Sequence, residues 1–162
     1  MSTTDLSGYD PSSVPDAGKM SFGIVVSDWN QEITQALLNG AKKTLIRHGA
    51  QKDNIIVRHV PGSFELPLGA QIIAESHDLD AIICIGCVIQ GETPHFTFIC
   101  ESVSHGIMRL NLEYKIPFIF GVLTTNTMEQ AKARSGGIRG NKGDEAAITA
   151  IKMAFLKLNI RK

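Results

Sequence analysis

The sequence predicts an α/β fold, a three-layer αβα sandwich built on an open parallel sheet of about four strands. Two observations lead to this prediction. From residue 22 onward, short apolar runs rich in β-branched residues alternate with longer segments of helical period. Each run is apolar on successive residues, which is typical of strands buried on both faces of a parallel sheet. Strands that alternate with crossover helices imply right-handed βαβ units, with helices on both faces of the sheet.

Four runs are expected to form the strands, and they span residues 22–27, 55–60, 81–86 and 117–122. The longest apolar stretch, residues 81–89, is far shorter than the roughly 20 residues that a membrane-spanning helix needs. We therefore expect no membrane partner.

The first and last helices are predicted from apolar stripes. Residues 30–48 should form a helix that ends at Gly49, a residue suited to a left-handed cap. The core face of this helix carries Ile33, Leu37, Ala41 and Leu45. Residues 144–158 should form the last helix, and its core stripe consists of Ala147, Ile151, Ala154, Phe155 and Leu158.

Three further helices are predicted between the strands. Residues 64–76 form one, ending before a polar turn at His77, and residues 94–113 form another after the third strand. A short helix should open at Thr127, because its spacing to Gln130 is that of a capping box.

We expect one domain, residues 21–162, preceded by an arm. Residues 1–20 contain thirteen Ser, Thr, Asp, Gly or Pro residues and show no hydrophobic period, so this segment lacks a core of its own. We predict a flexible N-terminal arm whose order comes from its neighbours. The rest of the chain is long enough to bury a core without a metal or a disulfide.

The charge balance excludes whole classes of partner. Sixteen Lys and Arg residues match sixteen Asp and Glu residues, which argues against nucleic acid or an anionic membrane surface as the main partner. Basic residues cluster in the acid-free stretch 134–142, and a second group is interpreted as a solvated helix end: Lys152, Lys157, Arg161 and Lys162. Three cysteines, an odd count, and the lack of a signal-like start favour the reducing cytoplasm.

The loops that follow the strands should open on one edge of the sheet, where such folds bind ligands. These loops hold residues 27–30, 61–65, 87–95 and 124–126. Their aromatic rings, carboxylates, histidine and hydroxyls suit a flat polar heterocycle better than a lipid or a long peptide. Trp29, the only tryptophan, either packs over the start of the first helix or serves as a stacking platform.

A Gly-Glu-Thr-Pro turn, residues 91–94, joins the third strand to a helix. Thr93 should be the N-cap and Pro94 the first helical residue. Free N–H groups and the helix dipole let such a turn hold a phosphate, and Gly91 would let the ligand approach the backbone, although ordinary capping explains the motif equally well. His95 follows, where the dipole disfavours the imidazolium, so we expect a neutral ring that can accept a proton.

Two other motifs have competing interpretations. The spacing of Cys84 and Cys87 is that of a redox pair, but Cys84 lies inside a predicted strand, so buried free thiols are expected. The cysteines and histidines form no paired zinc-ligand spacing, and no metal is expected. The glycine-rich stretch 136–143 is either an anion-contacting loop beside Arg134 or a turn between helices with solvated charges.

Five strings in register resemble the lumazine synthase family of riboflavin biosynthesis. They are residues 23–27 (GIVVS) with Trp29-Asn30, residues 60–67 (VPGSFELP), residues 86–96 (GCVIQGETPHF), residues 120–124 (FGVLT) and residues 140–143 (GNKG). The likeness covers about residues 20–158, and the third string is highly specific. It implies a flavodoxin-like sheet, in agreement with the fold predicted above.

The resemblance implies a transferase that condenses 5-amino-6-(D-ribitylamino)pyrimidine-2,4-dione with 3,4-dihydroxy-2-butanone 4-phosphate. The products are 6,7-dimethyl-8-ribityllumazine, phosphate and water, and the family uses no metal or cofactor. The resemblance also implies a homo-oligomer with pockets shared between adjacent subunits. The family forms pentamers, pairs of pentamers and sixty-subunit shells, and the sequence does not choose among them.

The same resemblance implies roles for the site residues. His95 would move protons as the catalytic residue, and Trp29 would stack on the pyrimidine. Ser63 and Glu65 would bind the ribityl chain beside Phe64. The pyrimidine edge would meet the backbone of Cys87, Val88 and Ile89, and the phosphate would lie at Gly91, Glu92 and Thr93. The neighbouring subunit would supply Phe120, Arg134 and Lys142.

Some features leave room for other functions. Asp28 and Glu145 stand at positions where the family varies, so neither is assigned a catalytic role. A non-catalytic flavin- or lumazine-binding or shell-forming relative is the alternative, and the presence of both His95 and Arg134 speaks against it, because stacking alone needs neither. A flavodoxin-type electron carrier is disfavoured, since no phosphate-binding Ser/Thr loop follows the first strand.

Overall fold

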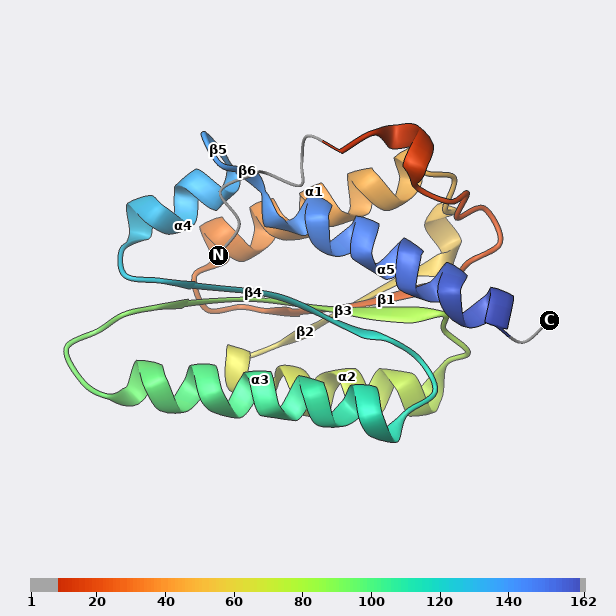
Figure 1. The fold of residues 1–162 in the computed structure, drawn as a ribbon. Helices are drawn as coiled ribbons and strands as arrows, with labels where there is room; N and C mark the ends of the chain where they lie inside the picture. Colours follow the sequence, from red (N-terminus) through yellow and green to blue (C-terminus); the bar gives the residue numbers. More distant parts are fainter. Residues whose placement is uncertain (1–8, 161–162) are drawn as a thin grey trace.

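The computed structural model describes residues 9–160, and a four-stranded parallel sheet with the order β2-β1-β3-β4 lies at its centre. The strands are β1 (Phe22–Ser27), β2 (Ile55–Val60), β3 (Ala81–Ile89) and β4 (Phe118–Thr125). The helices are α1 (Gln31–Arg47), α2 (Leu66–Ser76), α3 (His95–Glu113), α4 (Met128–Arg134) and α5 (Lys142–Ile160). Helices α1, α4 and α5 lie on one face of the sheet and α2 and α3 on the other, which confirms the predicted αβα sandwich (Figure 1).

The central strands are buried as predicted, but the edge strand β2 is not. All six residues of β1 are buried, whereas β2 exposes Arg58 and His59 and is elsewhere only half-buried. The prediction that every strand is buried on both faces is therefore wrong for β2. Strand β2 lies at one edge of the sheet and has a neighbouring strand on one side only, whereas β4, at the other edge, is mostly buried.

Strands β3 and β4 both run three residues farther than predicted. Their ladder continues through the pairs Val88↔Thr124 and Ile89↔Thr125. Residues 87–89, which the sequence assigned to a loop, therefore belong to a strand that extends toward the predicted site.

Two hydrophobic layers enclose the sheet, one beneath α1 and α5 and one above α2 and α3. The predicted stripe of α1 is confirmed, because all four of its residues are buried. In α5, Ala147, Ile151 and Ala154 are buried, whereas Phe155 and Leu158 are exposed, so the predicted stripe is wrong at its end. The last turns of α5 extend past the sheet, where no strand covers them (Figure 1).

The helix ends follow the predicted chemistry only in part. Gly49 has φ 102°, as expected of a left-handed cap, and the Thr127 side chain accepts a hydrogen bond from Gln130 N. The Gln130 side chain accepts from Asn126 N, so the capping box is not reciprocal. The predicted Thr93 cap is wrong, because α3 begins at His95 with Pro94 in the N-cap position and no side-chain cap.

Residues 9–20 of the predicted arm pack against the core, and Val14, Ala17 and Met20 are buried there. The Tyr9 hydroxyl and His48 Nε2 are 2.7 Å apart, and burial is the main cause that lowers the pKa of His48. Residues 1–8 of the arm, and Arg161 and Lys162 of the basic helix end, lie outside the described residues. Within residues 9–160, no helix is long and apolar enough to cross a membrane.

The glycine-rich stretch forms a small antiparallel hairpin, which corrects the expectation of a simple turn between helices. Its strands are β5 (Ser135–Gly137) and β6 (Gly140–Asn141), and α5 starts directly after β6. Gly136 has φ 118° and Gly140 has φ 71°, conformations that L side chains rarely adopt.

Candidate active site

A cavity of about 630 Å³ lies at the C-terminal ends of β1 and β3, and we refer to it as the β1–β3 cavity. This is the edge of the sheet at which the sequence placed the site. Eight of the predicted site residues line it: Trp29, Ser63, Phe64, Glu65, Cys87, Val88, Ile89 and His95. Residues far apart in the chain thus meet at one mouth because the parallel strands end there together.

The turn between β1 and α1 presents Trp29 to this cavity. Asn30 adopts a left-handed conformation with φ 58°, which asparagine tolerates better than most residues. Its Nδ2 donates to the carbonyl oxygen of Cys87 at 2.9 Å, and Trp29 N donates to Pro61 O at 3.2 Å. The Trp29 side chain is 72% exposed. Its ring is therefore held at the mouth without being packed away, which favours a stacking platform over a packing role.

Asp28, whose role the sequence left open, lies beside this turn. Its Oδ1 is 2.8 Å from Nδ1 of His59, and both side chains are about half exposed. Neither residue lines the β1–β3 cavity. This exposed pair contributes little to stability.

A single turn of 3-10 helix, Ser63–Glu65, also lines the cavity. A Cβ atom at Gly62 would lie 3.0 Å from Glu65 Oε2 and 3.5 Å from Trp29 Cδ1, so Gly62 keeps these two side chains close. The Ser63 Oγ atom is buried and has no hydrogen-bond partner among the described residues. Ser63 lines the cavity, and a Cβ atom at Gly86 would lie 2.7 Å from its hydroxyl oxygen.

Strand β3 gives the cavity a backbone edge. Its ladder with β1 ends at the pair Val26↔Ile85, whereas its ladder with β4 continues to Ile89↔Thr125. Residues 87–89 consequently extend beyond the end of β1. The hydrogen bond from the Asn30 side chain to the Cys87 carbonyl oxygen lies just past the end of this ladder. A strand edge of this kind presents N–H and C=O groups, the hydrogen-bonding groups that an imide-containing heterocycle also carries.

His95 is the first residue of α3, and its exposed imidazole lines the cavity. Gly91, Glu92 and Thr93 precede it in an exposed loop that lines neither of the two cavities described here. A Cβ atom at Gly91 would meet nothing within 4 Å. Within one chain, nothing therefore requires a glycine at residue 91, and its predicted approach to a ligand stays a prediction.

The cysteines behave as buried free thiols, as predicted. Burial raises the pKa of Cys84 to about 12 and that of Cys87 to about 11, so both stay protonated at neutral pH. This is the opposite of the lowered pKa that a redox-active thiol needs. Among residues 9–160, no group of His, Cys, Asp and Glu side chains is arranged to hold a metal ion.

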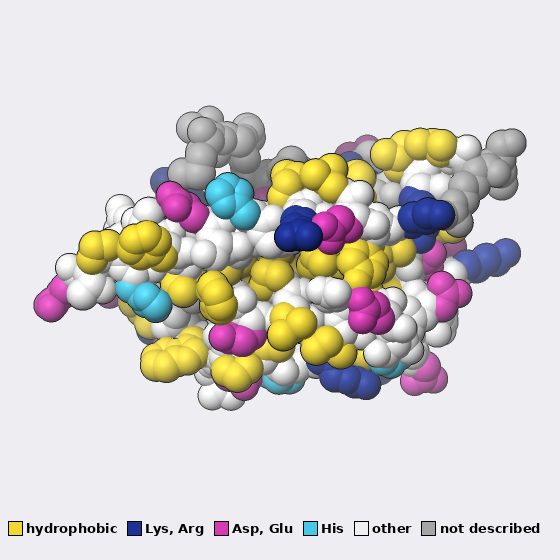
Figure 2. All heavy atoms as spheres, turned by 90° about the horizontal axis from the view of Figure 1, so that it is seen from below, with side chains coloured by type: hydrophobic (Ala, Val, Ile, Leu, Met, Phe, Trp, Pro, Cys, Tyr) yellow, Lys and Arg dark blue, Asp and Glu magenta, His cyan; other side chains and the backbone are white. Residues whose placement is uncertain are grey.

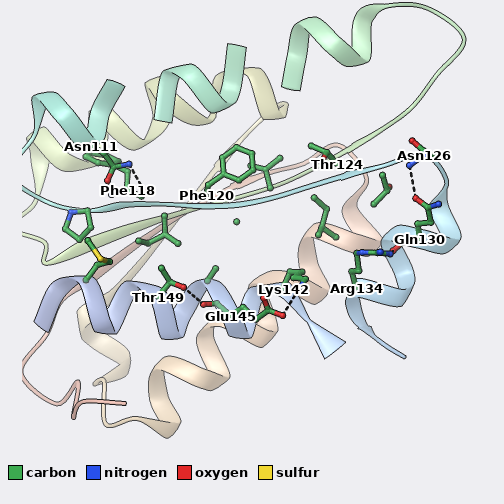
Figure 3. A pocket seen from close by; sticks show the side chains of 18 residues that line it. Asn111, Phe118, Phe120, Thr124, Asn126, Gln130, Arg134, Lys142, Glu145 and Thr149 are labelled. Atoms are coloured by element: carbon green, nitrogen blue, oxygen red, sulfur yellow. Dashed lines mark hydrogen bonds and ion pairs between the residues drawn. The ribbon is translucent and has the colours of Figure 1, made fainter. Parts of the chain in front are cut away.

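Phe120, Arg134 and Lys142 lie elsewhere, in a second cavity of about 730 Å³ that we refer to as the β4 groove. It runs along the edge strand β4 and α5, and it shares no lining residue with the β1–β3 cavity (Figure 3). Arg134 Nη1 donates to Gln130 O at 3.0 Å, and Lys142 Nζ lies 2.6 Å from Glu145 Oε1. The structure thus divides the predicted site residues between two cavities, apart from Gly91, Glu92 and Thr93, which line neither.

Three residues of the β1–β3 cavity fall outside the predicted set, namely Asn30, Gly62 and Ile99. Ile99 follows His95 by four residues, a spacing that places two side chains on one helix face and could have indicated it. The contact of Asn30 with Cys87 depends on the left-handed turn, which the sequence pattern does not reveal.

Known proteins resemble this chain over nearly its whole length. A family model described as 6,7-dimethyl-8-ribityllumazine synthase matches residues 19–157. A protein of that name from Parabacteroides distasonis is 59% identical over 149 residues, covering 92% of this chain and 93% of the relative. The Bacteroides fragilis protein of the same name is 62% identical over 143 residues, which cover 88% of this chain and 100% of the relative.

Proposed function

The chain belongs to the 6,7-dimethyl-8-ribityllumazine synthase family, and we propose that its active site is the β1–β3 cavity of one subunit completed by the β4 groove of an adjacent copy. The enzyme condenses 5-amino-6-(D-ribitylamino)pyrimidine-2,4-dione with 3,4-dihydroxy-2-butanone 4-phosphate. It releases 6,7-dimethyl-8-ribityllumazine, phosphate and water in riboflavin biosynthesis.

The observation that carries the shared-site proposal is the division of the site residues between two cavities. The stacking ring, the strand edge and His95 line the β1–β3 cavity, whereas Arg134 and Lys142 line the β4 groove. A pyrimidine and a phosphorylated ketone must lie next to each other to react, so both sets of residues have to face one space. A second copy of the chain can bring its β4 groove to this cavity.

The β1–β3 cavity suits the pyrimidine substrate. Its ring would stack on Trp29, and its imide edge would hydrogen-bond to the β3 backbone at residues 87–89. The ribityl chain would extend toward Glu65 and Ser63, beside Phe64. Holding both reactants in place converts a bimolecular encounter into an effectively unimolecular step. This positioning supplies a large share of the rate acceleration that the condensation needs.

His95 is positioned to move protons during the condensation. The amine attacks the ketone with loss of one water, phosphate leaves, and ring closure releases a second water, so protons must be removed and returned at several steps. An imidazole that lines the cavity can do both. No covalent bond to the enzyme is required.

Arg134 and Lys142 would hold the phosphate from the adjacent subunit. The guanidinium of Arg134 makes one backbone contact to Gln130, and no carboxylate pairs with it among the described residues. Its remaining donors match the oxygens of a phosphate. The loop before α3, at Gly91, Glu92 and Thr93, would supply the other side of the phosphate site together with the N-terminus of the helix.

Exposed apolar surface supports assembly into a homo-oligomer. On the outer helices, large hydrophobic side chains are exposed at Leu68, Ile72, Phe98, Met108 and Leu112, and Figure 2 shows apolar side chains gathered on this face. Surface of this kind marks an interaction site. Copies of the same chain are the partners we propose, and sedimentation would contradict this by finding a monomer with full activity.

We also propose that the enzyme works in the cytoplasm. All three cysteines, Cys84, Cys87 and Cys100, are free thiols. Unpaired thiols are typical of a reducing compartment.

The reaction itself is tested by incubating the purified protein with both substrates. Lumazine fluorescence and released phosphate should rise together in equal amounts. Binding of the pyrimidine with neither product formed would contradict the activity.

Trp29→Ala should weaken binding of the pyrimidine by about 1 kcal/mol, the scale of an aromatic stacking contact. Because Trp29 is the only tryptophan, quenching of its fluorescence measures this binding directly in the unsubstituted protein, and calorimetry measures it in the variant. Trp29→Phe is the matched control, since it keeps a ring and should retain most of the affinity. Equal affinities for all three proteins would return Trp29 to a packing role.

A further inference from the structure

We propose that Asn141 is a positioning residue that fixes Lys142, and with it the cationic end of the β4 groove, against α1. The inference rests on the proposed function, because it assumes that this groove holds the phosphate. Asn141 lines neither cavity, so any effect on phosphate must pass through a neighbouring residue, and Lys142 is the next residue in the chain that lines the β4 groove.

The Asn141 side chain joins three parts of the chain. Its Nδ2 donates to the carbonyl oxygen of Ala36 in α1 at 3.0 Å, across 105 residues of sequence. Its Oδ1 accepts from Gly143 N at 2.8 Å, which closes the turn over Lys142. Both polar atoms of a half-buried amide are thus used to tie the end of β6 and the start of α5 to α1.

Two glycines leave room for this close contact. A Cβ atom at Gly40 would lie 2.6 Å from Asn141 Nδ2, and a Cβ atom at Gly143 would overlap with the carbonyl oxygen of Leu37. Larger residues at these positions would lift the turn from α1. The amide therefore sits in a recess shaped by α1 on one side and by the start of α5 on the other.

The position of Lys142 follows from this anchor. Lys142 is flanked by Asn141 and Gly143, the two residues that the Oδ1 bond connects. Its Nζ lies 2.6 Å from Glu145 Oε1, and both residues line the groove (Figure 3). Arg134 precedes Ser135, the β5 residue that pairs with Asn141, but its guanidinium also donates to Gln130 O in α4. Loss of the Asn141 anchor should therefore displace Lys142 more than Arg134.

A second side-chain hydrogen bond between α1 and α5 provides a matched control. Thr44 is buried, and its Oγ1 donates to Asp144 Oδ1 at 3.1 Å. Thr44→Val removes this bond but leaves the Asn141 turn intact, and Thr44 lines neither cavity. It therefore measures how far general loosening of the α1–α5 contact affects the site.

The test compares Asn141→Ala with Thr44→Val in the assembled enzyme. Asn141→Ala should raise the KM for the phosphorylated ketone and the Kd for inorganic phosphate about tenfold, the effect of losing one or two hydrogen bonds. The KM for the pyrimidine should stay unchanged. Thr44→Val should lower the Tm and leave the Kd for phosphate unchanged. Asn141→Ser, which can still accept from Gly143 N but cannot reach Ala36 O, should lie between wild type and Asn141→Ala.

Three results would overturn the inference. If Arg134→Ala weakens phosphate binding but Asn141→Ala and Asn141→Ser do not, Asn141 has no positioning role and the proposed function stands. If Asn141→Ala and Thr44→Val raise both KM values alike, Asn141 is only structural. If Arg134→Ala also leaves phosphate binding unchanged, the groove does not hold the phosphate, and the proposed shared site fails with it.

Discussion

Replacing His95 by alanine is expected to lower the rate of condensation by a factor of about 10² or more, the contribution typical of a general acid–base group. His95 is the only histidine that lines the β1–β3 cavity within the described residues. The pyrimidine should still bind, because stacking on Trp29 and contact with the β3 backbone do not involve the imidazole. Some turnover should persist, since the remaining residues still hold the two reactants together.

His105→Ala is the matched control for this prediction. His105 is an exposed histidine on the same helix, α3, and it lies outside both cavities. Its replacement should leave kcat unchanged. Single-turnover rates, measured alongside pyrimidine affinity by Trp29 fluorescence, separate chemistry from binding. A His95→Ala enzyme with a wild-type rate would remove His95 from the mechanism.

Arg134→Ala is expected to raise the KM for the phosphorylated ketone by roughly 10- to 100-fold, the scale of a lost hydrogen-bonded contact between a charged group and its partner. The KM for the pyrimidine should change far less, because Arg134 lies in the β4 groove and the stacking site lies in the other cavity. Arg134→Lys should recover part of the loss, since a lysine keeps the charge but not the two-pronged geometry.

Arg139→Ala serves as the control for the loss of a positive charge. Arg139 is exposed, lies five residues further along the chain and does not line the groove. Its replacement should leave both KM values near those of the wild type. Steady-state kinetics with each substrate varied in turn provide the comparison. An Arg134→Ala enzyme that loses affinity for both substrates equally would point to damage of the fold.

The strands, and the edge of the sheet that carries the site, were largely predictable from the sequence. The runs at residues 22–27 and 55–60 became β1 and β2 with the same ends, because both are rich in β-branched residues, which favour strands. The predicted loop edge was also right, since parallel strands all end on one side. The motif around His95 placed that residue at a helix start, as the structure shows.

Other features depended on pairing and packing that the sequence pattern does not encode. Val88 and Ile89 became strand residues because Thr124 and Thr125 pair with them. Phe155 continued the apolar period of α5 but is exposed in the structure. The local sequence pattern indicates which residues are apolar. It does not indicate which of them the rest of the fold covers.

The two-cavity division of the site was predicted only through the family resemblance. Nothing in the spacing of Phe120, Arg134 and Lys142 indicates that they line a groove apart from Trp29 and His95. The separation follows from the strand order, because β4 lies at the edge of the sheet and β1 is separated from it by β3. The burial of the Ser63 hydroxyl likewise could not be predicted from the sequence and is seen only in the structure.

The shared site is tested most directly by mixing two variants that are each impaired, with the phosphorylated ketone supplied below its KM for the Arg134→Ala enzyme. Arg134→Ala chains retain His95, and His95→Ala chains retain Arg134, so a pocket formed between the two kinds of chain can contain both residues. After subunits have exchanged, which mass spectrometry of the mixed assemblies verifies, we predict activity well above the sum of the two variants measured separately. Verified co-assembly with no gain in activity would contradict the account, because it would mean that His95 and Arg134 of different subunits never serve the same pocket.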